Sequence, residues 1–379
     1  MKKIRVAFCL RDMQIGGVES VLIRTFDELL KNKNIELSLI TYVDISVPMY
    51  REYLDKHPEI KVYSLYPGSL LGTKLPHFFM WRLVIHVLRD IYRNAMRFMF
   101  GMRKFHNIDV FIDYHSFGFH KEFKQIKSGR KIAWFHSSID AFLNDKCINY
   151  CENYDKIVVL TDDFINQIDN VYPEQNGKFI RIYNPFDTVA IQNMANEKTN
   201  KISGDYFCCV SRLSADKDII TLLKGFDLFW LSNNKPNVKL VIVGDGNKAG
   251  DYKKYANSLE SSKQIVFVGA TKNPFVYMKN ARANILSSFS EGLPTVLIES
   301  MIVGTVNIAS DCKCGPREIL LNGDAGMLFK PGDATGLAKC MTEVYNNNVD
   351  VKQMIAKATK SLNRFDSHTI MRDIISQIS

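Results

Sequence analysis

The chain has 379 residues, of which 46% are hydrophobic and 23% charged, and its formal net charge is +9. At about 100–200 residues per domain, this length is enough for two domains that each bury a core of their own. The apolar fraction is that of globular proteins and no segment is of low complexity, so collagen-like, mucin-like and disordered chains are excluded.

Short apolar runs rich in β-branched residues recur along the chain, and each is followed by a longer segment with helical spacing. In the first half they predict strands at 4–10, 35–43, 61–65, 110–114, 132–135, 157–160 and 179–183. In the second half they predict strands at 206–210, 239–243, 265–268, 283–286, 306–309 and 327–329. Continuously apolar strands that alternate with helices are typical of parallel sheets covered on both faces. So many strands favour an α/β fold with two doubly wound, Rossmann-like domains over one very wide sheet.

The segment between Pro185 and Gly204 lacks a strand pattern and is rich in polar residues, so we expect the domain boundary there. The predicted division is an N-terminal domain over 1–190, a C-terminal domain over 191–363 and a final helix over 364–379. Whether this helix packs back on the N-terminal domain is left open. Two such domains would enclose a cleft at the carboxyl ends of their sheets, where open α/β folds bind ligands.

The ends of the apolar runs and the cysteine spacing bear on the compartment. The first apolar run ends at Arg11, too early for a signal peptide, and nowhere do 18 uncharged apolar residues follow one another. We therefore expect a cytoplasmic protein without a membrane-spanning helix. No two cysteines have the spacing of a zinc ribbon, which predicts buried thiols and no structural metal site. The cysteines are Cys9, Cys147, Cys151, Cys208, Cys209, Cys312, Cys314 and Cys340.

Positive charge is concentrated in one segment. Between Gly72 and Lys131 there are twelve Lys and Arg residues and four acidic residues, so this segment carries nearly the whole net excess. Four arginines between Arg82 and Arg97 stand at helical spacing among the apolar residues of 78–100, and such a helix suits an anionic membrane surface. A helix that packs on the core and exposes its arginines explains the pattern equally well. We expect no binding of nucleic acid, because no nucleic-acid-binding module accompanies the charge.

The strongest local signal is the run from Ser290 to Ser300, which follows a predicted strand. Gly292 lets the backbone approach a ligand, and Pro294 suits the first position of a helix. A helix that begins there would direct its free N–H groups into the cleft, toward an anion such as a phosphate. Glu291 lies before this helix and Glu299 about a turn and a half inside it, so two carboxylates can hold hydroxyl groups of one extended ligand.

The pair Glu291 and Glu299, followed by Cys314-Gly315-Pro316 and Asn322-Gly323, closely resembles a pattern of the retaining, nucleotide-sugar-dependent glycosyltransferases of the GT-B fold, family 4. The similarity extends to other short runs in that family's order: Gly16-Gly17, Phe135-His136, Arg212 with Lys217, and Gly244-Asp245-Gly246. It covers nearly the whole chain, is dense over 210–326 and is thin over 46–132.

The resemblance implies a role for each matching residue. Arg212 and Lys217 would neutralise the diphosphate of the donor and the charge that develops on the leaving group in the transition state. Glu299 would accept hydrogen bonds from the ribose, Glu291 would contact the transferred sugar, and His136 would lie near the reacting sugar. The donor would also contact the glycine loops and the helix start, at Gly16, Gly17, Gly244, Gly246, Gly292, Leu293 and Thr295. No general base is apparent, and retention is then explained by same-face attack in which the donor phosphate takes the acceptor proton.

Other residues of catalytic type have competing interpretations. Asp216-Lys217-Asp218 matches the Asp-x-Asp pattern with which a different glycosyltransferase fold holds a metal, but its lysine is already explained as a phosphate ligand. His115 and His120 fit acceptor contacts, a metal site or a structural role equally well. A nicotinamide-dependent oxidoreductase is disfavoured, because no Gly-x-Gly-x-x-Gly follows the first strand.

The sequence therefore predicts a metal- and cofactor-independent transferase. Its donor would be a nucleotide-diphosphate sugar, UDP by preference, and the transferred group a hexose or N-acetylhexosamine. The acceptor would be a glycan or lipid-linked saccharide in the synthesis of cell-surface polysaccharide, lipopolysaccharide or lipid-linked oligosaccharide, presented at the inner face of the membrane. The alternative is a catalytically silent nucleotide-binding partner subunit. The sugar, the linkage and the oligomeric state are not predicted.

Overall fold

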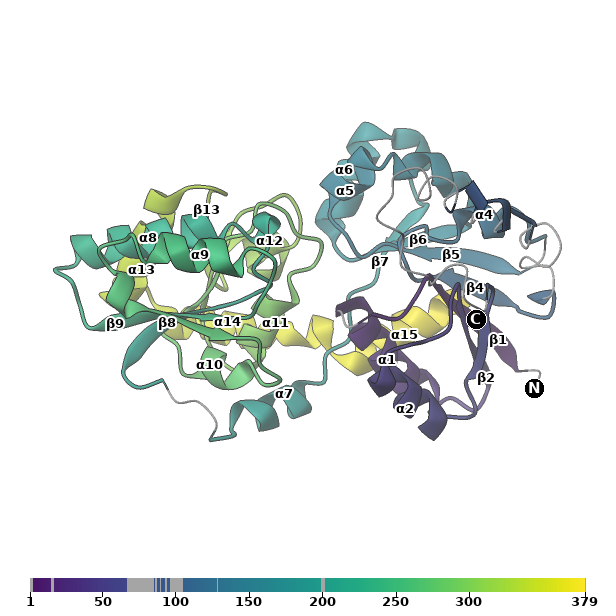
Figure 1. Ribbon diagram of the computed structural model, residues 1–379, viewed down its shortest axis with the longest axis horizontal. Coiled ribbons are helices and arrows are strands. Elements are labelled where there is room, and N and C mark those ends of the chain that lie inside the picture. The colour runs from purple at the N-terminus through teal and green to yellow at the C-terminus, as the bar shows by residue number, and fades with distance from the viewer. Residues whose placement is uncertain are drawn as a thin grey trace.

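Two α/β domains lie side by side in the computed structural model (Figure 1). The structure describes residues 3–14, 17–66, 85, 87–88, 90–92, 94–95, 105–127, 129–198 and 202–378. Each domain is built on one sheet in which all paired strands are parallel, with seven strands in the first sheet and six in the second.

The N-terminal sheet has the strand order β3-β2-β1-β4-β5-β6-β7. Its strands are β1 (Ile4–Leu10), β2 (Ile35–Thr41), β3 (Lys61–Ser64), β4 (Val110–Asp113), β5 (Arg130–Trp134), β6 (Lys156–Val159) and β7 (Phe179–Arg181). The helices described in this domain are α1 (Gly17–Leu29), α2 (Pro48–Lys56), α4 (His120–Phe123), α5 (Ile139–Asn144) and α6 (Asp162–Val171). The order reverses between β1 and β4, which opens a crevice at the carboxyl ends of these two strands.

The C-terminal sheet has the order β10-β9-β8-β11-β12-β13. Its strands are β8 (Asp205–Val210), β9 (Val238–Val243), β10 (Ile265–Gly269), β11 (Asn284–Leu286), β12 (Asn307–Ser310) and β13 (Met327–Phe329). Its helices are α7 (Thr188–Ala195), α8 (Ile219–Ser232), α9 (Ala249–Ala256), α10 (Phe275–Lys279), α11 (Thr295–Ile302), α12 (Pro316–Ile319), α13 (Ala334–Tyr345) and α14 (Val351–Ser361). The order reverses between β8 and β11, so this sheet has a matching crevice.

The predicted fold of two doubly wound sheets is confirmed. Each of the thirteen predicted strands is present, with bounds that differ by at most two residues. The central strands form because their apolar side chains are covered on both faces; in β1, for example, Val6 to Leu10 are all fully buried, whereas the edge strand β3 is exposed. All eight cysteines are free and buried, as expected.

The chain crosses between the domains twice. The predicted boundary at residue 190 falls inside α7, which packs on α10 and α11 of the second domain. The chain returns near residue 365, where Phe186 and Asp366 form a β-bridge. The last helix, α15 (Ser367–Ile378), then lies along α1 of the first domain (Figure 1), and Arg130 Nη1 donates a hydrogen bond to the backbone oxygen of Gln377 over 2.7 Å.

Part of the basic segment lies outside the described residues, including the four arginines from Arg82 to Arg97. Several positions between 85 and 95 are described and are helical, and three apolar side chains among them, Val87, Leu88 and Ile91, are 50–59% exposed. No helix among the residues that the structure covers is long and apolar enough to cross a membrane.

Candidate active site

A cavity of about 580 Å³ lies between the two domains. Its N-terminal wall is formed by α1, by the loops that follow β4 and β5, and by the crossing at Asn184. Its C-terminal wall is formed by Arg212, which follows β8, and by the start of α11 with Leu293, Thr295 and Glu299. The cavity therefore lies at the carboxyl ends of both sheets, where the strand order reverses.

A second cavity, of about 400 Å³, belongs to the C-terminal domain alone. It runs along the carboxyl ends of β8 and β9 and past Ala270 and Thr271 after β10. Arg212, Thr295 and Glu299 line both cavities, so the two adjoin at the N-terminal end of α11. An extended ligand with an anionic centre fits this arrangement, because the free N–H groups of α11 face the junction.

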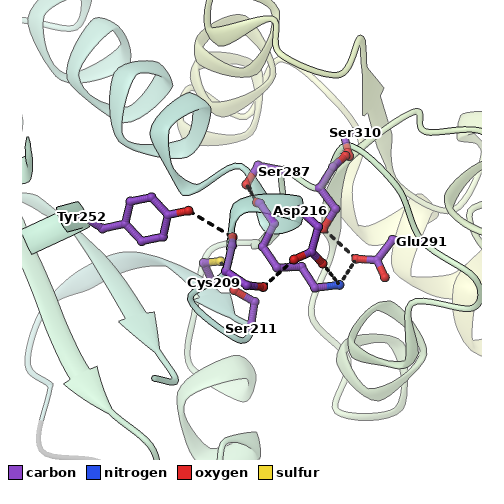
Figure 2. Close-up of polar contacts among 10 residues, drawn as sticks. Cys209, Ser211, Asp216, Tyr252, Ser287, Glu291 and Ser310 are labelled. Atoms are coloured by element: carbon purple, nitrogen blue, oxygen red, sulfur yellow. Dashed lines mark hydrogen bonds and ion pairs between the residues drawn. The ribbon is translucent and has the colours of Figure 1, made fainter. Parts of the chain in front are cut away.

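A short ion pair stands at the third and smallest cavity, of about 190 Å³. Lys217 Nζ donates to Glu291 Oε1 over 2.7 Å, and the two side chains are 15% and 11% exposed. Figure 2 shows Glu291 and Asp216 directed toward this ammonium group from two sides; Asp216 Oδ2 lies 3.6 Å from it. Two carboxylates thus share the positive charge of Lys217.

The surrounding hydrogen bonds explain why the pair forms. Ser288 Oγ donates to Glu291 Oε1 over 2.6 Å, and Ser310 Oγ donates to the backbone oxygen of Ser288 over 2.6 Å (Figure 2). Ser287 Oγ donates to the backbone oxygen of Lys217 over 2.9 Å. The end of β11 thereby holds both partners, and both donors to Glu291 use its Oε1 oxygen.

Asp218, next to Lys217, has a local structural role. Its side chain accepts a hydrogen bond from the backbone N–H of Thr221 over 3.2 Å and caps α8, with its own φ at 44°. A capping carboxylate satisfies one of the free N–H groups of a helix start. This local role accounts for the second aspartate of the Asp-x-Asp pattern.

The family Glycosyl transferases group 1 matches residues 192–361. The chain is 26% identical to the lipopolysaccharide 1,6-galactosyltransferase of Salmonella typhimurium, over 62% of this chain and 64% of that one. It is 28% identical to an alpha-1,4-N-acetyl-D-galactosaminyltransferase of Campylobacter jejuni, named for a PP-undecaprenol-linked substrate, over 56% of this chain and 57% of that one. The first three curated relatives are matched over 42–64% of their own length.

Among solved structures, S. aureus TarM in complex with UDP superposes with a TM-score of 0.73 at 14% identity, over 100% of both chains. The chain has the GT-B fold, and its residues 192–361 are a group 1 glycosyl transferase domain. In this GT-B protein the adjoining cavities lie at the interface of the two domains.

The structure places most of the predicted site residues around these cavities. Gly17, His136, Arg212, Leu293, Thr295 and Glu299 line the interdomain cavity; Gly244 lines the second, and Lys217 and Glu291 line the third. The sequence predicted Pro294 at the first position of α11, and the structure has it one position earlier, at the N-cap. Gly16 lies outside the described residues.

Gly246 and Gly292, expected at the donor, line none of the three cavities. A Cβ on Gly246 would lie 2.5 Å from the backbone oxygen of Leu213. A Cβ on Gly292 would lie 2.8 Å from that of His136, in the other domain. Both positions require glycine because another backbone segment passes close by. At Gly246 that segment belongs to the same domain, and at Gly292 it belongs to the other domain, across the cleft.

His136 is neutral at physiological pH. Burial, together with the neighbouring His115, lowers its pKa to about 3. Its ring packs at 4.5 Å from that of Tyr114, and its buried Nε2 has no hydrogen-bond partner among the described residues. A neutral imidazole with an unpaired nitrogen can form a hydrogen bond with a hydroxyl group. It does not act as a general acid near neutral pH, because only the protonated ring releases a proton there.

Glu299 lies at the junction of the two larger cavities. Burial raises its pKa to about 7, and the charge of Arg24 opposes part of that increase. Near neutral pH this carboxyl group is therefore divided between its charged and uncharged forms, and ligand hydroxyls that hydrogen-bond to the carboxylate would favour the charged form.

The loop after β4 carries His115 into the interdomain cavity. Asp113 anchors this loop: it accepts hydrogen bonds from the backbone N–H of Phe119 over 2.8 Å and from Tyr154 Oη over 2.6 Å. Burial nevertheless raises the pKa of Asp113 to about 6. His120 has a structural role, because its ring stacks on Tyr150 at 4.1 Å and lines none of the three cavities.

The sequence patterns single out neither Arg24 nor Asn184 of the N-terminal wall. Arg24 carries a signal in retrospect, since it stands seven residues after Gly17 and therefore about two turns along the same face of α1. Asn184 carries none, because its position at the crossing follows from the placement of the domains.

Proposed function

We propose that this chain is a retaining glycosyltransferase that moves a hexose or N-acetylhexosamine from a UDP-sugar to a glycan acceptor, without a metal or cofactor. The observation that carries the proposal is the meeting of Arg212, Lys217, Glu291 and Glu299 around adjoining cavities at the start of α11. The group 1 domain over residues 192–361 and the names of the relatives support transfer of a sugar in the synthesis of a surface glycan.

The donor would lie along the second cavity, with its base near Ala270 and Thr271 and its ribose at Glu299. Its diphosphate would then lie at the start of α11, between Arg212 and Lys217. Positive charge at this place stabilises the diphosphate more as it leaves than while it is bound to the sugar, which lowers the barrier. The TarM structure, which shares the fold, contains UDP, and this supports UDP as the nucleotide of the donor.

The transferred sugar would lie between Glu291 and His136. Because both internal donors use Oε1 of Glu291, its Oε2 is the oxygen open to the sugar hydroxyls. The neutral His136 would hydrogen-bond the sugar through Nε2. Neither residue then acts as a general base, so the acceptor proton passes to the leaving phosphate on the same face, and the configuration is retained.

The first test is thermal unfolding with UDP, GDP and ADP, each with and without EDTA. A ligand bound only by the folded state raises the melting temperature by mass action. We expect UDP to raise it and EDTA to leave the shift unchanged. A shift with GDP or ADP alone would reassign the base, a shift abolished by EDTA would refute metal independence, and no shift with any nucleotide would favour the silent-subunit alternative.

The acceptor would be a saccharide on a lipid carrier, as in the name of the Campylobacter relative, and the basic segment 72–131 would face an anionic membrane. The half-exposed Val87, Leu88 and Ile91 support this orientation, because apolar side chains between basic ones insert into an anionic lipid surface.

We expect the chain to sediment with vesicles that contain phosphatidylglycerol and to be released when salt is raised from about 0.1 M to about 1 M, because screening then shortens from about 10 Å to about 3 Å. Charge reversal of Arg82, Arg89, Arg93 and Arg97 should abolish the binding. The matched control reverses four exposed lysines of the C-terminal domain: Lys253, Lys254, Lys339 and Lys352. Equal losses in both variants, or no binding by the wild type, would contradict a membrane role for the segment.

A further inference from the structure

Arg24 lies on α1 of the N-terminal domain and lines the interdomain cavity. Its side chain is half-buried, and among the described residues it makes no hydrogen bond and no ion pair within 4 Å. Most half-buried arginines have a carboxylate or carbonyl partner, because an unpaired charge away from water is costly. Beside its longer-range attraction to Glu299, the guanidinium group of Arg24 is therefore available to pair with a group from outside the chain.

The opposite wall of the same cavity carries Arg212, which also lacks a hydrogen bond or ion pair within 4 Å in the described part of the chain. The two arginines come from different domains. Two carboxyl groups also line the cavity. Glu19 Oε1 accepts the backbone N–H of Gln14 over 3.2 Å, and Glu299, whose charge interacts with that of Arg24, forms no ion pair within 4 Å with either arginine among the described residues. The two guanidinium groups therefore make the cavity suitable for an anionic ligand.

A third feature of the cavity is an unpaired polar atom in a residue of its wall. Asn184, at the crossing between the domains, is 5% exposed and lines the cavity, and its Oδ1 has no hydrogen-bond partner among the residues that the structure describes. A buried amide oxygen without a partner destabilises the fold unless a ligand supplies the missing donor. Hydroxyl groups next to a phosphate would do so.

We propose that Arg24 binds a phosphate group in the interdomain cavity, opposite Arg212, so that one anionic ligand is held by both domains at once. This inference rests on the proposed function, since the phosphate would come either from the diphosphate of the donor or from a lipid-linked acceptor. The planar guanidinium group binds phosphate through two parallel hydrogen bonds, which a single point charge does not reproduce. A ligand shared in this way stabilises the closed arrangement of the two domains.

The test compares wild type with Arg24→Ala, Arg24→Lys and a matched control, Lys31→Ala. Lys31 lies just after α1, is 69% exposed and pairs with Glu28 over 2.7 Å. Lys31→Ala therefore removes one positive charge from the same region but outside the cavity. Calorimetric titration with UDP and with uridine separates phosphate binding from base binding. Titration with farnesyl diphosphate and farnesol, at saturating UDP, reports on the phosphate of a lipid-linked acceptor.

We expect the Kd of one phosphate ligand to rise about tenfold or more in Arg24→Ala and less in Arg24→Lys, because a charge-assisted hydrogen bond is lost. The Kd of uridine should stay within about twofold in every variant. An increased Kd of UDP in Arg24→Ala assigns the phosphate to the donor. An increased Kd of farnesyl diphosphate, with the Kd of UDP unchanged, assigns the phosphate to the acceptor.

Arg212→Ala separates this inference from the proposed function. If Arg212→Ala weakens UDP binding and Arg24→Ala weakens neither phosphate ligand, the inference is wrong and the proposed function stands. If Arg24→Ala and Lys31→Ala weaken binding equally, the effect is one of overall charge and the inference is again wrong. A wild-type chain that binds neither UDP nor farnesyl diphosphate overturns both.

Discussion

Replacing Lys217 by alanine should lower turnover by about a hundredfold or more, measured as release of UDP from the UDP-sugar that the wild type accepts. The reason is that Lys217 would stabilise the charge that builds up on the leaving diphosphate, and loss of one such donor in an enclosed site costs about two to three orders of magnitude. Its Nζ lies at the small cavity beside the start of α11, so no other described lysine replaces it. Donor affinity should fall less than turnover.

A loss of stability must be separated from this loss of catalysis. Without Lys217, the carboxylate of Glu291 keeps Ser288 as its donor but loses its cationic partner, and an unpaired charge that is 11% exposed destabilises the fold. The double variant Lys217→Ala/Glu291→Gln removes that charge. We expect it to recover the melting temperature of the wild type and to remain inactive.

The matched control is Lys248→Ala, which removes the same charge from an exposed pair with Asp251 on the C-terminal domain. It should leave turnover within about twofold of wild type, as exposed ion pairs contribute little. If Lys217→Ala retains wild-type turnover, or if the double variant recovers turnover together with stability, then Lys217 is a structural residue and the proposed site is wrong.

Replacing Gly292 by alanine should lower turnover by about tenfold or more while leaving UDP bound. Its Cβ would lie 2.8 Å from the backbone oxygen of His136 and 3.0 Å from that of Ser137, so the methyl group would push the two domains apart. Overpacking of this kind costs about 1–3 kcal/mol, which is enough to shift the closed arrangement to a minor state. The cavity that donor and acceptor share would then widen.

Small-angle scattering detects this opening directly, as an increase in the radius of gyration in the presence of UDP. The control is Gly250→Ala in α9, where an added Cβ meets nothing within 4 Å and alanine favours the helix. It should leave both turnover and radius unchanged. An unchanged radius in Gly292→Ala would show that the contact with His136 gives way locally and does not control closure.

The positions of the strands along the chain could be predicted because their signal is local. Most of the thirteen strands are short apolar runs with buried side chains, and the edge strand β3 is the exposed exception, so their pattern and their flanking turns are present in the sequence itself. The same is true of the helix start after Pro294 and of the spacing between Glu291 and Glu299, both of which depend on a few neighbouring residues. The fold and the core of the candidate site were therefore determined by the sequence.

What the tertiary structure decided depends on residues far apart in the chain. Lys217 and Glu291 are 74 residues apart, and only the packing of β11 beside β8 makes each the partner of the other. His136 is neutral because of its burial, and Gly292 is needed because a strand end of the other domain approaches it. Arg24 becomes a candidate ligand because α1 faces the start of α11 across the cavity. Burial, charge environment and contact between domains arise only when both sheets are placed, and local sequence patterns carry no record of that placement.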